Sequence, residues 1–376
     1  MQKKIGIITL NGYVNYGNRL QNYALQEVVK SYGFDVETIW VDIKKNNPKD
    51  IPLLIKAKNI LKSSPKDNYE RLHNKVTGIL YKKKLNNKRE RIFRNFSRKH
   101  IHETTFKLDE NNINKGLLDE YEYFITGSDQ VWNPFFRKGD PAYFLTFAPK
   151  EKRIAYSPSF GTDQIPEDYI DRYKKWISEM HRLSVREEAG AKIIKELTGR
   201  DAPVLIDPTL MLSKEKWLSI ANVPSNKPKT GYLLTYFLGR ISRAKRKIIN
   251  KIAKNNHLKI INLAQPNDKL PYLSGPSEFI DYINSSSIFI TDSFHGAVFS
   301  ILLETPFVVF DREGKFPSMN SRIDTLLSTF KFETRHVDKI NINSDLLKMD
   351  FSHVHPILKL QRQKAFEYLE DALNLK

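Results

Sequence analysis

Apolar runs alternate with amphipathic stretches from the first residues of the chain onward. Residues 5–10 form an apolar run typical of a buried strand, and the periodicity of residues 19–32 predicts a helix. Asn18 suits the N-cap of this helix and Gly33 its C-terminal stop. Residues 34–41 then alternate as a second strand. This strand, helix and strand unit predicts parallel pairing and the start of a doubly wound sheet.

The same alternation continues to about residue 222 and then begins again. Further strands are expected to end at Ile125, Tyr156, Val185 and Ile206, before a linker rich in Pro, Asn and Lys at 222–231. After the linker, strands are expected at 231–238, 259–263, 288–291 and 307–310, with helices between them. The chain therefore divides into an N-terminal domain, 1–222, a C-terminal domain, 230–345, and a last helix, 356–376, expected to pack back toward the first domain.

The expected fold class is α/β, with two Rossmann-like domains facing a central cleft as in GT-B transferases. In open parallel sheets, ligands bind at the carboxyl ends of the strands. Polar residues that directly follow a strand are therefore the first candidates for a site.

The composition of the chain excludes disorder, thiol chemistry and a membrane span. The chain has 376 residues, 40% of them hydrophobic, which excludes disorder as its general state. It has no cysteine, so disulfides, thiolate metal sites and cysteine nucleophiles are excluded. No apolar run reaches the length of about 18 residues needed for a membrane span. The apolar stretch near the start of the chain is shorter than the core of a secretory signal. We expect a cytoplasmic protein.

The positive charge is concentrated in one stretch. Residues 56–100 hold 15 Lys or Arg and three acidic residues, which gives +12 of the total formal charge of +18. The surrounding stretch, about 47–110, is expected to be a basic helical insertion containing a pair of amphipathic helices. Such helices suit an anionic membrane surface, which would make the protein peripheral on the inner face of the cell membrane. The alternative is a solvated insertion, and nucleic acid is not expected because no nucleic-acid-binding motif is present.

The segment TDSFHGAVFSILLETP, from Thr291, carries the richest chemistry. A strand ends, Ser293 can cap, and a helix begins near His295 and Gly296, so the positive end of a helix faces the cleft. Such a helix start suits a phosphate or carboxylate, with His295 as proton donor or anion ligand. A structural role is the alternative for a histidine at this position.

Other polar residues also follow strands. GSDQVWNP places Asp129 and Gln130 after a strand, where Asp129 is either a general base, a sugar ligand or an Asx turn. Arg186 in SVREEAG is either an anion ligand or an ion-pair partner of Glu187 or Glu188. Asp207, in the sequence DPT, is expected only to shape a turn.

Together with NGYVNYGNRLQNYALQ, DPTLML and SRIDTLL, these motifs resemble the polysaccharide pyruvyl transferase family over residues 5 to about 330, interrupted by the basic insertion. The resemblance implies transfer of the pyruvyl group of phosphoenolpyruvate onto two hydroxyls of one sugar, giving a cyclic ketal in cell-surface polysaccharide biosynthesis. It implies no cofactor and no metal, because phosphoenolpyruvate is a co-substrate. The acceptor would be a sugar, expected to be part of a lipid-linked oligosaccharide.

The resemblance also assigns roles to the two sides of the cleft and to single residues. It implies that the N-terminal domain carries the acceptor side of the cleft and the C-terminal domain the donor side. It makes His295 the general acid, and places Arg186, Arg322, Ser293 and Gly296 around the donor. It places Asp129, as a second catalytic residue, with Asn15, Tyr16 and Gln130 at the acceptor.

Two rival functions stay open. A GT-B glycosyltransferase that uses a nucleotide sugar would also suit this cleft, since a helix start followed by Glu304 fits a diphosphate and a ribose. A non-catalytic protein that binds glycans or polyanions is the second rival.

Overall fold

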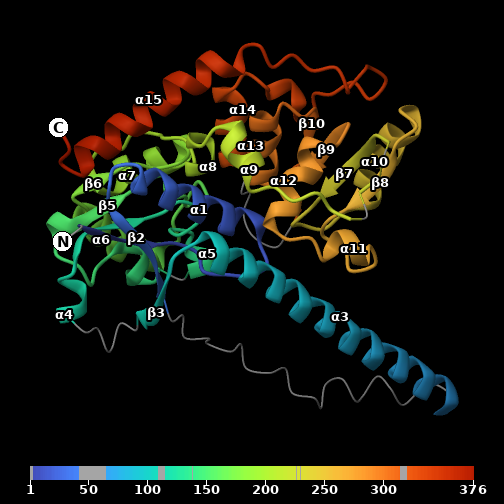
Figure 1. Cartoon of the computed structure of the whole chain (residues 1–376), viewed down its shortest axis with the longest axis horizontal. Coiled ribbons are helices and arrows are strands. Elements are labelled where there is room, and N and C mark those ends of the chain that lie inside the picture. The colour runs from blue at the N-terminus through green and yellow to red at the C-terminus, as the bar shows by residue number, and fades with distance from the viewer. Residues whose placement is uncertain are drawn as a thin grey trace.

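A computed structural model gives the fold, and it describes residues 3–41, 65–108, 115–137, 139–225, 227–228, 230–313 and 320–376. Two parallel sheets, each flanked by helices, make up the body of the molecule (Figure 1). The prediction of an α/β protein with two Rossmann-like domains is therefore confirmed. The first part of the expected basic insertion, 47–64, lies outside the described residues.

The first sheet has six strands in the order β3-β2-β1-β4-β5-β6. At its centre, Ile5 pairs in parallel with Val36 on one side and Tyr123 on the other. This is the strand order of a doubly wound Rossmann sheet, whose direction of winding reverses between β1 and β4. The strands are β1 (Lys4–Ile8), β2 (Asp35–Val41), β3 (Glu103–Leu108), β4 (Tyr121–Thr126), β5 (Arg153–Ala155) and β6 (Arg182–Leu183).

Helices of the first domain cover this sheet. The one that matters most for the site is α1 (Tyr16–Lys30), which connects β1 to β2. Besides the long helix α3, which is described below, the described part of this domain has α4 (Lys115–Leu118), α5 (Pro134–Arg137), α6 (Glu167–Ser178), α7 (Glu188–Thr198), α8 (Pro208–Met211) and α9 (Lys214–Ser219), with 3₁₀ turns at Pro141–Phe144 and Lys150–Lys152.

The second sheet has four parallel strands in the order β10-β9-β7-β8. They are β7 (Tyr232–Tyr236), β8 (Lys259–Asn262), β9 (Ile288–Thr291) and β10 (Phe307–Val309). The helices of this domain are α10 (Arg243–Asn255), α11 (Lys269–Tyr272), α12 (Pro276–Asn284), α13 (Phe294–Leu303) and α14 (Ser321–Thr329), with a 3₁₀ turn at Glu333–Arg335.

A continuous apolar core joins the two domains. The ring of Tyr16 stacks on Phe279 with 4.2 Å between centroids and meets Tyr236 edge-on at 5.2 Å. The Tyr16 hydroxyl donates to the Ser274 carbonyl oxygen at 3.0 Å, so its one polar atom is satisfied inside this core. The start of α1 is therefore fixed against the second domain.

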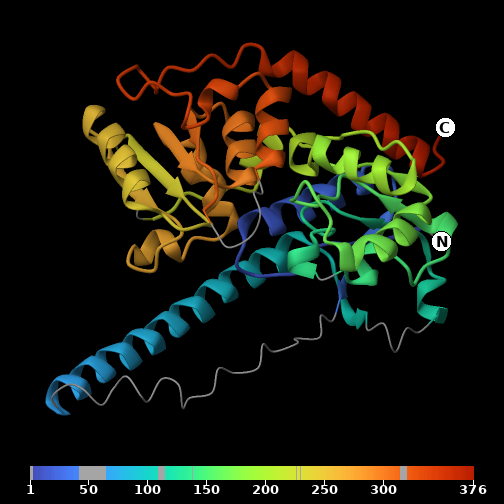
Figure 2. The same ribbon diagram turned by 180° about the vertical axis from the view of Figure 1, so that it is seen from behind.

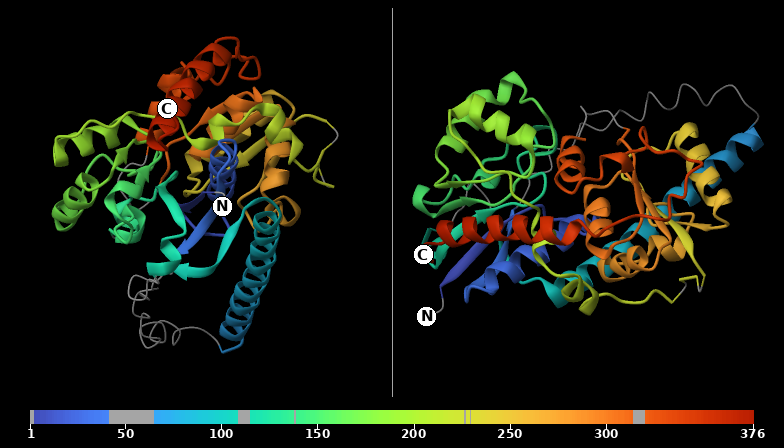
Figure 3. Two further views of the ribbon diagram at one scale, coloured as in Figure 1. Left: turned by 60° about the vertical axis from the view of Figure 1, so that its left-hand side comes forward. Right: turned by 90° about the horizontal axis from the view of Figure 1, so that it is seen from above.

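The last helix, α15 (Val354–Ala372), runs from the second domain back across the first (Figure 3). Its Arg362 donates to the carbonyl oxygens of Leu210 and Leu212 at 2.7 and 2.6 Å, and Tyr368 donates to that of Ala155 at 2.9 Å. These bonds anchor α15 on the first domain.

The basic stretch folds as one long helix, α3 (Pro65–His100), which projects from the body of the molecule (Figure 2). The expectation of a helix pair is wrong, because no Gly or Pro interrupts the helix between Leu80 and His100. Arg89 is buried and donates to the carbonyl oxygens of Leu263 and Tyr272, so this basic residue holds α3 against the second domain.

Three local expectations differ from the structure. Helix α1 begins at Tyr16, because the side chain of Asn15 accepts from the backbone N–H of Asn18 and serves as the N-cap. Ile206 does not end a strand, since pairing there is limited to one bridge between Val185 and Val204. Strand β3, for which no strand was expected, extends the edge of the first sheet.

Candidate functional site

The polar loops of both domains meet around one cavity of about 280 Å³. Its first-domain wall follows β1 and β4, the strands between which the sheet reverses direction, where such folds bind ligands. Its second-domain wall follows β7, β9 and β10. We call it the interdomain cavity; it is lined by Leu10, Asn15, Asn18, Asp129, Gln130, Phe136, Leu238, Ser293, Phe294, His295, Arg312 and Arg322.

His295 lies in the first turn of α13, directly after β9. Ser293 is the N-cap of this helix, and its hydroxyl accepts from the Gly296 backbone N–H at 3.3 Å. The imidazole is nearly buried, and its Nε2 lies 3.5 Å from Oδ2 of Asp207. An imidazole that faces a carboxylate inside a cavity is a group suited to proton transfer.

Gly17 of α1 makes room for this imidazole. A Cβ at Gly17 would lie 2.1 Å from Nδ1 of His295. Any side chain here would therefore displace the ring from its place between α1 and Asp207. The sequence analysis missed Gly17, because its role depends on a helix of the other domain.

Asp207 is the principal residue that the sequence analysis missed. One carboxylate oxygen does what was expected and caps α8, accepting from the Thr209 N–H at 3.0 Å. The other oxygen, Oδ2, accepts from Ser128 Oγ at 2.7 Å and from Arg186 Nη1 at 2.8 Å, besides facing His295. Burial alone would raise the pKa of Asp207, but the charges and hydrogen bonds of His295 and Arg186 hold it well below its usual range. Its carboxylate is therefore ionised.

Arg186 links two carboxylates in this network. Besides its bond to Asp207, its Nη2 lies 3.4 Å from Oδ1 of Asp129. The expected ion pair with Glu187 or Glu188 is absent among the described side chains, because Arg186 turns inward between the two aspartates. Arg186 does not line the interdomain cavity, so its expected contact with the donor is not supported by its position.

Asp129 faces the interdomain cavity from the end of β4. It accepts from the side chain of Asn18, which lies within α1 and is not its cap. Burial would raise the pKa of Asp129, but the positive charges of Arg186, His295 and Arg322 lower it. This carboxylate is therefore ionised and able to accept a hydrogen bond from a ligand hydroxyl.

Arg322 of α14 is a buried cation that also lines the cavity. Its guanidinium donates to the side-chain oxygen of Gln130, but it forms no ion pair with any carboxylate that the structure describes. Burial, together with the charges of Arg186 and Arg312, lowers the pKa of Arg322 to about 9. A desolvated cation without a counter-ion is stabilised by an anionic ligand.

Further groups at this end of the cavity suit an anion. Arg312, which follows β10 and was not singled out from the sequence, donates to the Asp292 carbonyl oxygen at 3.3 Å and lines the cavity. The positive end of α13 and the hydroxyl of Ser293 lie beside it. Two arginines and a helix start thus share one wall with His295.

Two expected site residues have other roles. Tyr16 is fully buried in the core between the domains and does not line the cavity, so its position does not support the expected contact with the acceptor. Gly296 does not line the cavity either, and a Cβ there would lie 2.8 Å from Thr291 Oγ1, so its small size serves the packing of α13 on β9. Asn15 and Gln130 do line the cavity, as expected for acceptor residues.

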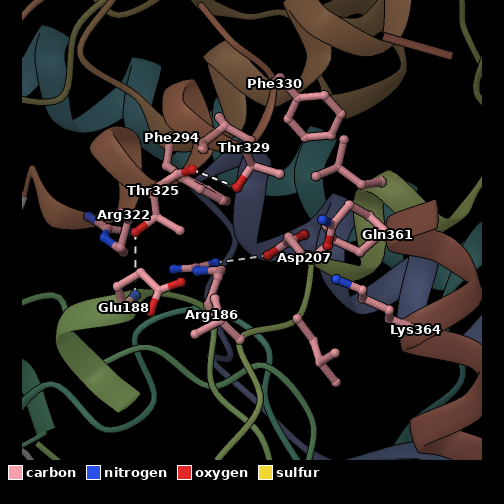
Figure 4. A pocket seen from close by; sticks show the side chains of 15 residues that line it. Arg186, Glu188, Asp207, Phe294, Arg322, Thr325, Thr329, Phe330, Gln361 and Lys364 are labelled. Atoms are coloured by element: carbon pink, nitrogen blue, oxygen red, sulfur yellow. Dashed lines mark hydrogen bonds and ion pairs between the residues drawn. The ribbon is translucent and has the colours of Figure 1, made fainter. Parts of the chain in front are cut away.

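A second cavity, of about 160 Å³, reaches the same network from behind Phe294 (Figure 4). Its lining includes Arg186 and Asp207. Thr325 and Arg322 of α14 and Gln361 and Lys364 of α15 also line it. The Arg186 guanidinium lies 4.4 Å from the centroid of the Phe294 ring, and Phe294 lines both cavities.

Two other features lie away from the interdomain cavity. Glu304, on which the nucleotide-sugar reading relied, ends α13 and pairs with Lys214 at 2.7 Å. Asp311, His336 and Asp338 could offer metal ligands, but the two carboxylates face opposite nitrogens of one imidazole, at 3.2 and 3.5 Å. A single ion would bind only one of those nitrogens.

Comparison with known proteins places this geometry in context. The model of the polysaccharide pyruvyl transferase family matches residues 15–314, which include every residue of the interdomain cavity except Leu10 and Arg322. No curated protein matches the chain. A glycosyltransferase from Rickettsia africae is similar in structure, with a TM-score of 0.51 and 13% identity over 99% of each chain. The S. aureus MnaA–UDP co-structure has a TM-score of 0.51 and 9% identity, covering 100% of this chain and 98% of its own.

These two structural likenesses, at low identity, establish the GT-B type of fold and nothing about the ligand. None of the helices in the described part of the chain is long and apolar enough to cross a membrane.

Proposed function

The chain belongs to the polysaccharide pyruvyl transferase family, and on this premise we propose that it transfers the pyruvyl group of phosphoenolpyruvate to two hydroxyls of one sugar. The product is a cyclic pyruvate ketal in a cell-surface polysaccharide precursor, and phosphate is released. The observation that carries the proposal is that one cavity is lined both by Arg322, a buried cation with no carboxylate partner among the described residues, and by His295, which faces the Asp207 carboxylate.

The donor binds at the second-domain wall of the cavity. Phosphoenolpyruvate carries a phosphate and a carboxylate, and Arg322, Arg312 and the start of α13 supply positive charge for both. Gln130 orients Arg322 through the hydrogen bond to its guanidinium. Because Arg322 is desolvated in the free protein, the donor anions also relieve an unfavourable charge.

His295 supplies the proton that begins the reaction. Protonation of C3 of phosphoenolpyruvate by the imidazolium makes C2 electrophilic, and the first sugar hydroxyl adds to C2 with loss of its proton. The second hydroxyl then attacks C2, the bond from C2 to the phosphate oxygen breaks, the proton of the second hydroxyl leaves with the phosphate, and the ketal closes. Asp207 stabilises the imidazolium at the start, and Ser128 and Arg186 keep Asp207 ionised and in place.

The acceptor sugar approaches from the first-domain wall. Asp129 accepts a hydrogen bond from the attacking hydroxyl, and Asn15 and Asn18 lie beside it. Arg186 acts through Asp129 and Asp207 and contacts neither substrate directly. Phosphoenolpyruvate is a co-substrate, and the reaction as written needs no separate cofactor.

We further propose that the acceptor is lipid-linked and that α3 brings the enzyme to an anionic membrane surface. Lys82, Lys83, Lys84 and Lys88 are exposed, next to the exposed apolar side chains of Leu80 and Tyr81. Basic and apolar side chains together favour binding at an anionic interface.

The test is incubation of the protein with phosphoenolpyruvate in D₂O and a panel of synthetic glycosides with free hydroxyl pairs. We expect phosphate release and a ketal whose methyl group carries one deuterium, because the solvent-derived proton goes to C3. Products are read by mass spectrometry. If a nucleotide sugar raises Tm and phosphoenolpyruvate does not, the glycosyltransferase alternative is the better one.

A further inference from the structure

A larger cavity, of about 620 Å³, lies at the carboxyl ends of β7 and β8. We call it the arginine cavity, because three of its lining residues are Arg240, Arg243 and Arg246. The full lining is Phe237, Leu238, Gly239, Arg240, Ile241, Ser242, Arg243, Arg246, Ala264 and Gln265. None of these three arginines has a role in the donor site described above.

The charge in this cavity is not neutralised. Arg240, Arg243 and Arg246 are exposed, and none forms an ion pair or a side-chain hydrogen bond with any residue that the structure describes. Ser242 caps α10, its hydroxyl accepting from the Lys245 N–H at 3.3 Å, so the positive end of this 13-residue helix adds to the same field. The cavity therefore offers several charged donors and no acidic side chain.

The arginine cavity adjoins the interdomain cavity. Leu238 lines both of them. The turn that carries Leu238 is held by Asp292, whose carboxylate accepts from the N–H groups of Leu238 and Gly239 at 2.7 and 2.8 Å. A Cβ at Gly239 would lie 2.9 Å from that carboxylate, so the turn packs closely only because Gly239 has no side chain. Asp292 directly precedes Ser293, Phe294 and His295, so one ligand can extend from the reacting centre into the arginine cavity.

We propose that the arginine cavity binds the diphosphate of the acceptor, and that the acceptor is a glycosyl diphosphate whose sugar lies in the interdomain cavity. This inference rests on the proposed function, because it assigns the part of the acceptor that does not react. A guanidinium group can donate two parallel hydrogen bonds to phosphate oxygens, and three such groups carry enough positive charge to neutralise a diphosphate that is esterified at both ends. The donor anions are already served by Arg312 and Arg322, so the arginine cavity is a separate anion site.

The first experiment measures binding without turnover. Inorganic diphosphate is titrated by calorimetry into wild type, into R240Q/R243Q/R246Q, and into the control K247Q/K251Q/K254Q. The control removes the same charge from exposed residues of the same helix that do not line the cavity. We expect the arginine variant to bind diphosphate about 10-fold or more weakly, and the control to bind within about twofold of wild type. Equal weakening in both variants would overturn the proposal, since it would reflect net charge alone.

A second titration separates the two anion sites. Diphosphate is titrated in the presence of saturating phosphoenolpyruvate. Binding that persists supports a separate site, whereas complete competition would mean that diphosphate occupies the donor site and would overturn the proposal.

The kinetic arm compares acceptors that share one sugar: a neutral methyl glycoside, a nucleoside diphosphate sugar and a farnesyl diphosphate sugar. The arginine variant should raise KM about 10-fold or more for the diphosphate acceptors and leave KM for the methyl glycoside unchanged. The diphosphate acceptor with the lower KM for the wild type shows whether the natural acceptor is a nucleotide sugar or a lipid-linked sugar. Absence of transfer to every acceptor would count against the proposed function, while the calorimetry still decides the anion site. An equal change of KM for all acceptors would show that the arginine cavity does not bind the diphosphate of the acceptor.

Discussion

At the level of single residues, the chemistry of His295 depends on neighbours from other segments of the chain. Asp207 faces its Nε2, and Gly17 leaves space at Nδ1. Arg322 is the opposite case, since its cation is buried and no carboxylate in the described ranges pairs with it. His295 therefore faces a charged partner already in the free protein, whereas the charge of Arg322 is left for an anionic ligand to neutralise.

Replacing His295 with Asn should remove the general acid while keeping a polar side chain of similar size. We expect the rate of pyruvyl transfer to fall by about 10² to 10⁴, with Tm within a few degrees of wild type. The matched control is His336→Asn, outside the cavity, which should retain wild-type turnover. A His295→Asn enzyme of near-normal activity would remove this histidine from the mechanism.

Replacing Arg322 with Gln should stabilise the free protein and abolish donor binding, because the desolvated charge is lost together with the anion ligand. Thermal unfolding with and without phosphoenolpyruvate measures both effects. The expected result is a higher Tm without ligand and no rise when the donor is added.

Arg200 provides the control for this experiment. It donates to the carbonyl oxygens of Ile177 and Met180 at 3.0 and 2.7 Å, so Arg200→Gln should lower Tm and keep the response to phosphoenolpyruvate. A lower Tm for Arg322→Gln, with the donor response intact, would show that Arg322 has a purely structural role.

At the level of elements, the site depends on how closely α1 of one domain approaches α13 of the other. This approach is possible because Gly17 has no side chain, while Asn15 starts α1 and Ser293 starts α13. Asn18, one turn into α1, bonds to Asp129 at the end of β4. A single helix start therefore positions both proposed catalytic residues.

Gly17→Ala should displace the His295 ring, because the added Cβ would overlap Nδ1. We expect kcat to fall at least about tenfold while KM for phosphoenolpyruvate, which depends on Arg322, changes little. Gly12→Ala is the matched control, since a Cβ at Gly12 meets nothing within 4 Å. Equal kinetics for the two variants would contradict the proposed positioning of His295.

For the whole molecule, the projecting helix α3 raises the question of where the enzyme works. Its exposed lysines lie on a segment held to the body by the buried Arg89, whose guanidinium also lies 4.7 Å from the centroid of the Tyr16 ring. Arg89 is therefore part of the packing between α3 and the two domains, and it is unsuited to a test of surface charge.

The variant K82Q/K83Q/K84Q/K88Q should bind anionic vesicles more weakly than wild type, by about 1 kcal/mol for each lysine near the surface. Binding of the wild type should also weaken as salt is added. Sedimentation with vesicles of anionic or neutral lipid gives both measurements. The control K174Q/K175Q/K192Q/K195Q removes the same charge from α6 and α7, and equal loss in both variants would leave α3 as a solvated insertion.

Most of the elements, their parallel arrangement and the place of several polar residues after strands could be predicted from the sequence. The bounds of β9, 288–291, are confirmed, and Ser293 caps α13 as expected. The family was also recognisable from motifs, each of which is a short continuous stretch. These features depend on periodicity and capping, which act between residues a few positions apart.

Which of those polar residues meet depends on the packing of the two domains, and this could not be predicted from the sequence. Asp207 was read as a turn residue because one of its oxygens does cap a turn, while its other oxygen faces His295 and Arg186. The family resemblance places Tyr16 at the acceptor, yet its ring is buried between the domains. The packing of two domains sets these contacts, and local pattern carries no information about which side chain faces which across such an interface.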